Sequence, residues 1–498
     1  MQTLNFARRF FLATVVLACI PCLNASVFAQ QPANSTAQPT PQQGTTQSAA
    51  QADPKQRQAV IDSLVGEMDD LIPGDYADGS AEQKKLIEVA NFFIERNEQK
   101  VRAALGELTI ADPNVPPQEL IMAGLAYAAN NQTQGKAILE QAAILHRDHP
   151  GIALAFARLA LLQSRYFDSL ALSEKARTTN RTSKLSAQAK QFYESEILDV
   201  MTVIELRRNQ LESAEQSALA WEKLNPNNDK MLIAAAEIQF LRNKPEAAVG
   251  FLNRRSDKVK QDFPTAGVMG KWYLGKNDLA AYEEQIQKAY SSNPNSGFVQ
   301  IEYAASLLHK ENFEQAMKIV DGYEASNGAS SQSKLIRGRI AFSMRQYAPA
   351  GALFAGLFQE QPNNLEHSYL YALTLLENPN EKQQRQGLQL AQRNYQLNPN
   401  NQLTTSILAW ALYKNGSKEV AMEIVSRAAK ASPLVPDAAY LIARMLTEEG
   451  RGPQAKVILK PYVDSPAIFL YRARAKELLV SIEAEAGQSA DALPDPSK

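Results

Sequence analysis

The chain has 498 residues, of which 45% are hydrophobic and 8% aromatic, and its formal net charge is -1. Lys and Arg number 52 against 53 acidic residues, which gives no bulk attraction to nucleic acid or to anionic lipid. Its two cysteines are Cys19 and Cys22, so disulfides, thiol catalysis and cysteine metal sites are excluded for the chain beyond residue 22.

The first 29 residues predict a secretory signal peptide. Arg8 and Arg9 precede an apolar stretch that starts at Phe10, and Ala29 is a small residue at a position that signal peptidase recognises. We expect an exported protein that is periplasmic or extracellular, with Gln30 as its mature amino terminus. The lack of cysteine in the mature chain suits a bacterial envelope better than an animal secretory route.

Two other interpretations of this segment stay open. Residues 10–29 are just long enough to span a bilayer as an uncleaved anchor. The sequence "VLAC", which ends at Cys19, loosely resembles a lipoprotein cleavage site, although the leucine before the alanine weakens the match. In both alternatives the chain would be tethered to a membrane.

Residues 30–57 are rich in Gln, Pro, Thr and Ser and contain almost no large apolar side chain. Such a segment cannot bury a core, so we expect a disordered linker that acts as a spacer. A wall- or polysaccharide-binding tail is the alternative, but the composition offers little for it. A helix and a loop are expected over 58–82.

A small residue recurs at a spacing near 34 through the rest of the chain. It occupies Ala103, Ala137, Ala171, Ala214, Ala247, Ala281, Ala316, Ala350, Gly387, Ala421 and Ala455. A second small residue precedes it by about a dozen positions, at Ala90, Gly124, Ala235, Gly270, Ala304, Gly338, Ala372, Ala409 and Ala443. This period indicates helix-turn-helix units that must stack on one another to bury their apolar faces.

Prolines mark the end of many units, at Pro150, Pro226, Pro294, Pro362, Pro399, Pro433 and Pro466. The chain here resembles the tetratricopeptide repeat family. The resemblance is carried by Gly270, Tyr273, Ala289 and Pro294, by Gly338, Tyr347, Ala350, Phe354 and Pro362, by Ala409, Gly416, Ala421, Ala428 and Pro433, and by "NPNN" or "QPNN" endings at Asn225, Gln361 and Asn398. It implies an all-α, right-handed α-solenoid of about eleven tandem repeats over residues 83–469.

Two units depart from the regular spacing. The unit around Thr202 carries about nine extra residues, and the unit around Ala372 has about three. After the last repeat, residues 470–486 form an amphipathic pattern with no following partner, which predicts a helix that caps the solenoid. Residues 487–498 are expected to be disordered.

The sequence offers almost no catalytic equipment. His146 and His149 are the only histidines at a spacing suited to metal ligation, but no third ligand is near and Pro150 interrupts the helix, which favours capping over a metal site. No phosphate-binding loop or nucleophile elbow is present. We therefore expect a protein that is not an enzyme and that needs no cofactor and no metal, with a cryptic hydrolase as the rival interpretation.

The resemblance implies a groove lined by the first helix of each repeat, which receives a protein or peptide partner. The groove residues in the repeat register are Lys271, Arg339, Tyr369, Trp410, Tyr413, Tyr440 and Arg444. Aromatic and arginine side chains are common energetic anchors of interfaces, although Trp410 could equally pack between helices. The expected function is a non-catalytic interaction scaffold or adaptor. The alternative is a membrane-tethered component of a machine for envelope assembly, secretion or polysaccharide export.

Overall fold

The computed structural model describes residues 54–491, except 75, 77–78, 113, 130, 430–432 and 466–468. Within this part all regular structure is α-helical, in twenty-five helices without a strand, and none of them is long and apolar enough to cross a bilayer. The expected signal peptide, both cysteines and most of the expected linker lie outside the described residues. The first helix, α4 (Pro54–Asp69), begins within the last residues of that linker.

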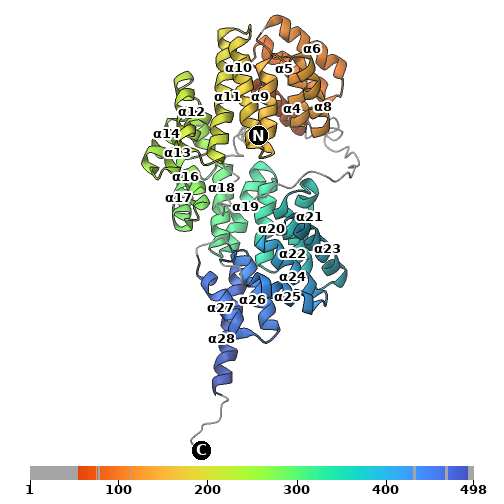
Figure 1. Cartoon of the computed structure of the whole chain (residues 1–498), viewed down its shortest axis with the longest axis vertical. Coiled ribbons are helices and arrows are strands. Elements are labelled where there is room, and N and C mark those ends of the chain that lie inside the picture. The colour runs from red at the N-terminus through yellow and green to blue at the C-terminus, as the bar shows by residue number, and fades with distance from the viewer. Residues whose placement is uncertain are drawn as a thin grey trace, which may run out of the picture. The chain divides into compact units, whose positions relative to one another are not determined.

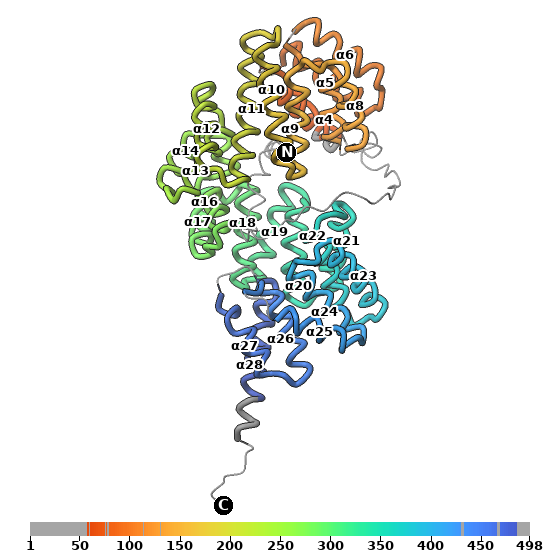
Figure 2. The backbone as a smooth tube through the Cα atoms, viewed as in Figure 1, coloured from red at the N-terminus to blue at the C-terminus, as the bar shows by residue number. Residues whose placement is uncertain are grey.

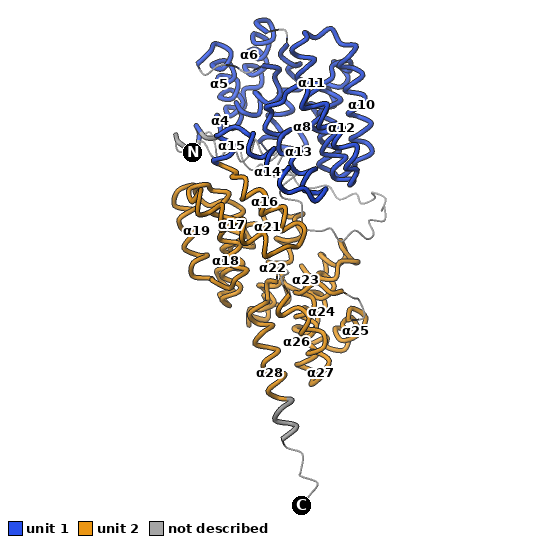
Figure 3. The backbone as a smooth tube through the Cα atoms, turned by 90° about the vertical axis from the view of Figure 1, so that its left-hand side faces the viewer, with its two compact units in different colours: residues 1–261 blue, residues 262–498 orange. Residues whose placement is uncertain are grey.

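The chain divides into two compact units, residues 1–261 and 262–498 (Figure 3). Unit 1 continues with α5 (Ala81–Ile94), α6 (Glu98–Ala111), α7 (Gln118–Ala128), α8 (Gln132–Leu145), α9 (Pro150–Leu162), α10 (Tyr166–Thr182), α11 (Ala187–Arg207), α12 (Leu211–Leu224), α13 (Asp229–Leu241) and α14 (Pro245–Arg254). The short α15 (Asp257–Asp262) ends at the boundary.

Unit 2 contains thirteen further helices in the described part (Figure 1). They are α16 (Thr265–Gly275), α17 (Leu279–Ser292), α18 (Gly297–His309), α19 (Phe313–Asn327), α20 (Ser331–Ser343), α21 (Tyr347–Glu360), α22 (Leu365–Glu377), α23 (Glu381–Leu397), α24 (Gln402–Lys414), α25 (Lys418–Ala428), α26 (Pro436–Glu448), α27 (Gly452–Val463) and α28 (Arg472–Asp491).

Consecutive helices pack in pairs joined by short turns (Figure 2). Eleven pairs run from α5–α6 to α13–α14 and from α16–α17 to α26–α27 in the described residues, which confirms the predicted solenoid of helix-turn-helix repeats. The first helix of a pair also contacts the first helix of the next pair, as in α9–α11, α18–α20 and α24–α26. The first helices of a unit therefore share one surface, which we call its first-helix face.

The turn inside most pairs places one residue in the left-handed region. These residues are Arg96, Ser164, Asn209, Asn243, Asn277, Glu311, Arg345, Gly416 and Gly450, with φ between 56° and 88°. In each case the next amide donates to a carbonyl five residues back; the amide of Asp278, for example, lies 2.9 Å from the Tyr273 oxygen. This pattern closes the first helix and reverses the chain.

The position of this turn defines the register of the repeat and shows that the predicted series of small residues is wrong in the early repeats. The buried position of the second helix lies five residues after the left-handed residue, at Val101, Ser169, Ala214, Ala248, Tyr282, Ala316, Ala350, Ala421 and Ala455. Ala103, Ala137, Ala171 and Ala247, the small residues that the spacing predicts for the early repeats, are exposed. Helix contact at this position requires a side chain that packs, and valine, serine or tyrosine satisfies that requirement as well as alanine does.

The second series of small residues is buried as expected, except for Gly124, which is half-buried. Gly338 shows why a small residue is needed: a Cβ atom there would lie 2.6 Å from Cε1 of Phe354, a side chain that is itself fully buried. The absence of a side chain lets α20 and α21 approach closely. Ala304, Ala372 and Ala443 occupy the equivalent places in other repeats and are 0% exposed.

The "NPNN" and "QPNN" endings form the turns between repeats. The final asparagine caps the next first helix, as Asn228 does for α13, Asn364 for α22 and Asn401 for α24, each with its side chain accepting a backbone N–H. A backbone bond such as Asn364 N to Gln361 O, 3.0 Å long, closes the turn. The motif therefore ends one repeat and starts the next.

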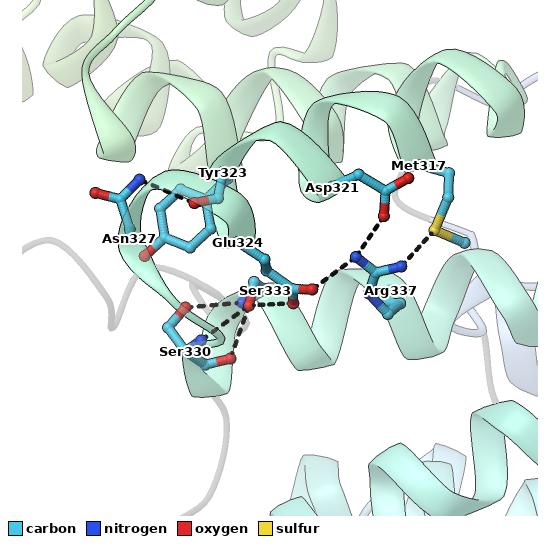
Figure 4. A network of polar contacts seen from close by, with 8 residues as sticks. All are labelled: Met317, Asp321, Tyr323, Glu324, Asn327, Ser330, Ser333 and Arg337. Atoms are coloured by element: carbon cyan, nitrogen blue, oxygen red, sulfur yellow. Dashed lines mark hydrogen bonds and ion pairs between the residues drawn. The ribbon is translucent and has the colours of Figure 1, made fainter. Parts of the chain in front are cut away.

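The turn between α19 and α20 has no proline and uses a polar network instead (Figure 4). Gly328 has a φ of 78° and ends α19, while Ser330 and Ser333 form a capping box at the start of α20. Glu324 accepts from Ser333 Oγ at 2.7 Å and from Arg337 Nη2 at 2.6 Å. Hydrogen bonds thus replace the stiffness that proline gives to the other turns.

The two irregular units are lengthened within their helices. The buried position moves from Ser169 to Ala214, a step of 45 that exceeds the usual 34 by 11 residues, and the 21-residue α11 takes up most of them. The other insertion shifts the buried position from Ala350 to Gly387, a step of 37, and Gly387 lies within the 17-residue α23.

Helices outside the eleven pairs flank the two series. In unit 1, α4 packs on α5 and α7; in unit 2, α28 packs on α26 and α27. The last helix extends to Asp491, beyond residue 486 at which we expected it to end. Between Arg472 and Pro494 the sequence has no proline, and Gly487 alone does not stop a helix.

Candidate functional site

All seven residues predicted for the groove lie on first helices of unit 2. Lys271 belongs to α16, Arg339 to α20, Tyr369 to α22, Trp410 and Tyr413 to α24, and Tyr440 and Arg444 to α26. The repeat register therefore assigned them to the correct helices, and the tertiary structure shows which side chains reach a surface.

Cations of one first helix pair with carboxylates of the next along this face. Lys271 Nζ lies 2.8 Å from Glu302 Oε1 on α18, and Arg339 pairs with Glu366 on α22. In unit 1, Arg158 on α9 pairs in the same way with Glu196 on α11. These pairs tie successive repeats together, so much of the charge on the face is compensated within the chain.

The three aromatic residues on α24 and α26 are buried. Trp410 is fully buried and lies beneath the guanidinium of Arg444, whose Cζ is 4.1 Å from the ring centroid. Tyr413 donates to Glu449 Oε1 at 2.7 Å, and Tyr440 stacks on Tyr471 at 4.5 Å between centroids. In this conformation these three rings contribute to packing rather than to an open surface.

Arg339 and Tyr369 line a cavity of about 80 Å³ in unit 2. Side chains of five successive first helices contribute to it, including His309 of α18, Leu403 of α24 and Asp437 of α26. Residues at and before the start of α28 close the remaining side, among them Phe469, Arg472 and Arg474. The cavity is therefore a place where the first-helix face of unit 2 converges.

Burial and charge set the protonation of two groups in this cavity. Burial, together with the positive charges of Arg339, Arg472 and Lys271, lowers the pKa of His309 to about 3, so this imidazole is neutral at pH 7. Burial raises the pKa of Asp437 to about 6. The amide of Tyr471, which donates to Oδ1 at 3.2 Å, and the positive charge of Arg339 oppose this shift of the pKa. Three guanidinium groups, of Arg339, Arg472 and Arg474, thus line the cavity together with the carboxyl groups of Glu311 and Asp437.

Sequence reasoning missed the contribution of the carboxy-terminal segment. Arg472 and Arg474 belong to the expected terminal cap, and His309 and Asp437 carry no motif. The sequence "YRARAK" was a signal that could have indicated this contribution. Two arginines next to a tyrosine at the start of an amphipathic helix are more typical of an interface than of a solvent-exposed helix end.

A second cavity, of about 60 Å³, lies in unit 1 next to the lengthened α11. Glu196 and Asp199 of α11, Arg158 of α9 and Lys230 of α13 line it, with Glu67 of α4 and the two residues that follow this helix on another side. Burial raises the pKa of Asp199 to about 6, and the nearby charge of Lys230 opposes this shift. The irregular repeat thus supplies buried charges at the first-helix face of unit 1.

The pair of histidines caps helices. His149 is the N-cap of α9 and its Nδ1 accepts from the amide of Gly151 at 3.3 Å, while His146 ends α8 with Nε2 3.1 Å from Glu119. Burial lowers the pKa of His149 to about 4. In the part of the chain that the structure describes, no three His, Cys, Asp or Glu side chains are grouped as metal ligands.

The helix pairing, the left-handed turns and the shared first-helix faces place the chain in the class of tetratricopeptide-type α-solenoids. No protein-family model and no curated protein matches the chain.

Solved structures of similar type exist. A tetratricopeptide repeat protein from Parabacteroides merdae aligns with 58% of this chain and 99% of its own, at 14% identity and a TM-score of 0.33. Yeast Tom70 aligns with 83% of this chain and 97% of its own, at 13% identity and a TM-score of 0.29. YrrB, described as a TPR protein with an unusual peptide-binding site, covers 39% of this chain and 99% of its own, at 18% identity and a TM-score of 0.26. At these values the likeness extends to the type of fold and no further.

Proposed function

We propose that this protein is a non-catalytic interaction scaffold that binds a protein or peptide partner on the first-helix face of unit 2. The observation that carries the proposal is the convergence of five first helices on one cavity, which Arg339, Tyr369 and Asp437 line. Stacked repeats build such extended surfaces from many modest contacts with a few strong anchors.

Arg339 is the anchor to test. Its side chain is 25% exposed and that of its partner Glu366 is 36% exposed, so removal of Arg339 leaves the Glu366 carboxylate in contact with water. The matched control is Arg385 on the second helix α23, which pairs with Glu381 at 3.5 Å and is 76% exposed. Both residues are arginines paired with a carboxylate, but only Arg339 lines the cavity.

The experiment is affinity capture from the native extract with the full mature chain and with the variants Arg339→Ala and Arg385→Ala. We expect Arg339→Ala to reduce recovery of the specific partner at least tenfold, whereas Arg385→Ala leaves it unchanged. Equal recovery with all three proteins, at equal unfolding midpoints, would refute the assignment of the first-helix face.

The proposal includes an exported location, supported by the basic residues, apolar stretch and Ala29 of the amino terminus. We place its role in the cell envelope. The tethered alternative rests on residues 10–29 and on Cys19. The mass of the native amino terminus separates them: Gln30 as the first residue refutes the tethered form, and an acylated Cys19 refutes the soluble one.

A further inference from the structure

The start of α28 reaches back to helices more than a hundred residues earlier in the chain. Arg474 Nη2 donates to the carbonyl oxygen of Phe342 at 2.6 Å, and Lys476 Nζ lies 2.7 Å from Glu311 Oε2. Glu477 pairs with Arg345. The partners of these three contacts lie at the ends of α18 and α20, so α28 does more than cover the last repeat.

Arg474 is the centre of this contact. Only 7% of it is exposed, and its Cζ lies 4.7 Å from the ring of Phe342, 5.4 Å from Tyr347 and 5.1 Å from Tyr471. Phe342 and Tyr471 also meet edge to face at 5.4 Å. A guanidinium enclosed by three rings with one carbonyl acceptor is the geometry of a recognised ligand side chain.

The contact is nevertheless incomplete. Nη1 of Arg474 and the hydroxyl of Tyr471 are buried without a hydrogen-bond partner, and Arg474 lines the cavity of about 80 Å³. The two ion pairs are accessible: Lys476 and Glu311 are 47% and 26% exposed, and Arg345 and Glu477 are 58% and 61% exposed. Exposed ion pairs contribute little net stability, and unsatisfied buried polar groups reduce it.

The remainder of α28 is held differently. Ile482 is buried and belongs to the same apolar cluster as Leu459 and Val463 of α27, and the partly buried Leu478 and Leu479 pack against this cluster. Apolar packing holds this part of the helix to α27, whereas Arg474 and two exposed ion pairs hold its start to α18 and α20. The first turns can therefore leave the face while the rest stays attached.

We propose that the first turns of α28 are an internal ligand of the first-helix face of unit 2, and that this face binds a basic amphipathic helix of a partner when they are displaced. The inference rests on the proposed scaffold function and names the chemistry of its partner. The face offers the ring and the carbonyl of Phe342 on α20 and the carboxylate of Glu311 after α18, and the ring of Tyr347 at the start of α21 lies next to them. Its complement is an arginine followed two residues later by a lysine, as in Arg474 and Lys476.

The test uses the full mature chain and a labelled synthetic peptide with the sequence of residues 469–486, with binding followed by fluorescence anisotropy. An opened variant, Lys476→Glu with Glu477→Lys, places like charges opposite Glu311 and Arg345. A tethered helix competes at high effective concentration, so its release exposes the face to the peptide. We expect the opened variant to bind the peptide at least tenfold more tightly than the wild type.

Two further variants control the charges. Glu381→Lys with Arg385→Glu exchanges an exposed pair on α23 and must bind the peptide as weakly as the wild type. Adding Glu311→Lys and Arg345→Glu to the opened variant restores complementary charges within the chain, and weak binding of the peptide should return. A return to weak binding in this variant would show that the opened variant binds the peptide because α28 is released, not because the protein is partly unfolded.

Equal peptide affinity of the wild type and the opened variant would overturn the proposal, as would the absence of binding to both. Dimerisation of the opened variant in place of peptide binding would overturn it too, because a second copy, not a partner, would then take the face. If the peptide binds as expected while Arg339→Ala leaves partner capture unchanged, the scaffold function fails and the occupancy of the face by α28 stands.

Discussion

Arg444 and Glu377 form an ion pair between first helices that are two repeats apart. Arg444 Nη1 on α26 lies 2.9 Å from Oε1 and 3.1 Å from Oε2 of Glu377, the last residue of α22. The side chain of Glu377 is 6% exposed and that of Arg444 24%. The first-helix face of unit 2 is therefore curved enough for alternate first helices to touch, and Arg444, expected to meet a partner, is engaged within the chain.

Replacement of Arg444 by alanine is expected to destabilise the protein by about 2–3 kcal/mol, because it leaves the buried Glu377 carboxylate unpaired and uncovers Trp410. Urea denaturation followed by circular dichroism measures this loss. The Arg385→Ala variant serves as the control, with a change below about 0.5 kcal/mol since its ion pair is exposed. Equal midpoints for the two variants would contradict the structural role of Arg444.

Glycine at position 338 is expected to be required by packing. Gly338→Ala should lower the free energy of unfolding by about 1–3 kcal/mol, because the new Cβ would lie 2.6 Å from the Phe354 ring. A Cβ atom added at Gly356, within α21, would meet no other atom within 4 Å. Gly356→Ala should therefore raise stability by about 0.5–1 kcal/mol through helix propensity. Thermal unfolding of both variants tests the contrast, and a shift of the same sign in both would refute it.

Substitution at the left-handed turn positions is expected to change the stability of the protein. Ser164 has a φ of 57°, a conformation that costs a non-glycine residue about 1–2 kcal/mol. We expect Ser164→Gly to raise stability by about 0.5–1 kcal/mol, after allowance for the greater entropy of glycine in the unfolded chain. Gly416 occupies the equivalent position with a φ of 88°, so Gly416→Ala should destabilise. Calorimetric midpoints that move the opposite way would show that the turn is unstrained.

Glu237 on α13 is expected to make stability depend on pH. Burial raises its pKa to about 7, and its Oε2 is buried without a hydrogen-bond partner. A carboxyl whose pKa is raised in the folded state stabilises that state fully below its pKa in the unfolded chain, about pH 4.5. This stabilisation is lost as the pH rises from there to its pKa in the folded state, about pH 7. We expect Glu237→Gln to be more stable than the wild type by about 2 kcal/mol at about pH 8 and nearly equal to it at about pH 4.5. Parallel pH profiles of the two urea midpoints would exclude this role.

The candidate site was predictable in part. The repeat register located Arg339 and Tyr369 on the helices that line the cavity, because a period near 34 fixes which residues share a face. It could not reveal that Trp410 and Tyr440 are buried, since this depends on how strongly successive repeats curve. Arg474 was beyond reach for the same reason: its acceptor, the Phe342 carbonyl, lies 132 residues away in sequence.

The sequence by itself determined the helix pairs and the turns that join one repeat to the next. These are local properties: a glycine or asparagine ends the first helix in several repeats, a final asparagine starts the next repeat, and small residues let the two helices of a pair approach. Tertiary structure decided the register of the earlier repeats, where Val101 and Ser169 replace the expected alanines, and it decided what covers the first-helix face. Contacts such as Arg444 with Glu377 and Arg474 with Phe342 arise from the accumulated rotation of stacked repeats, which no single stretch of sequence encodes.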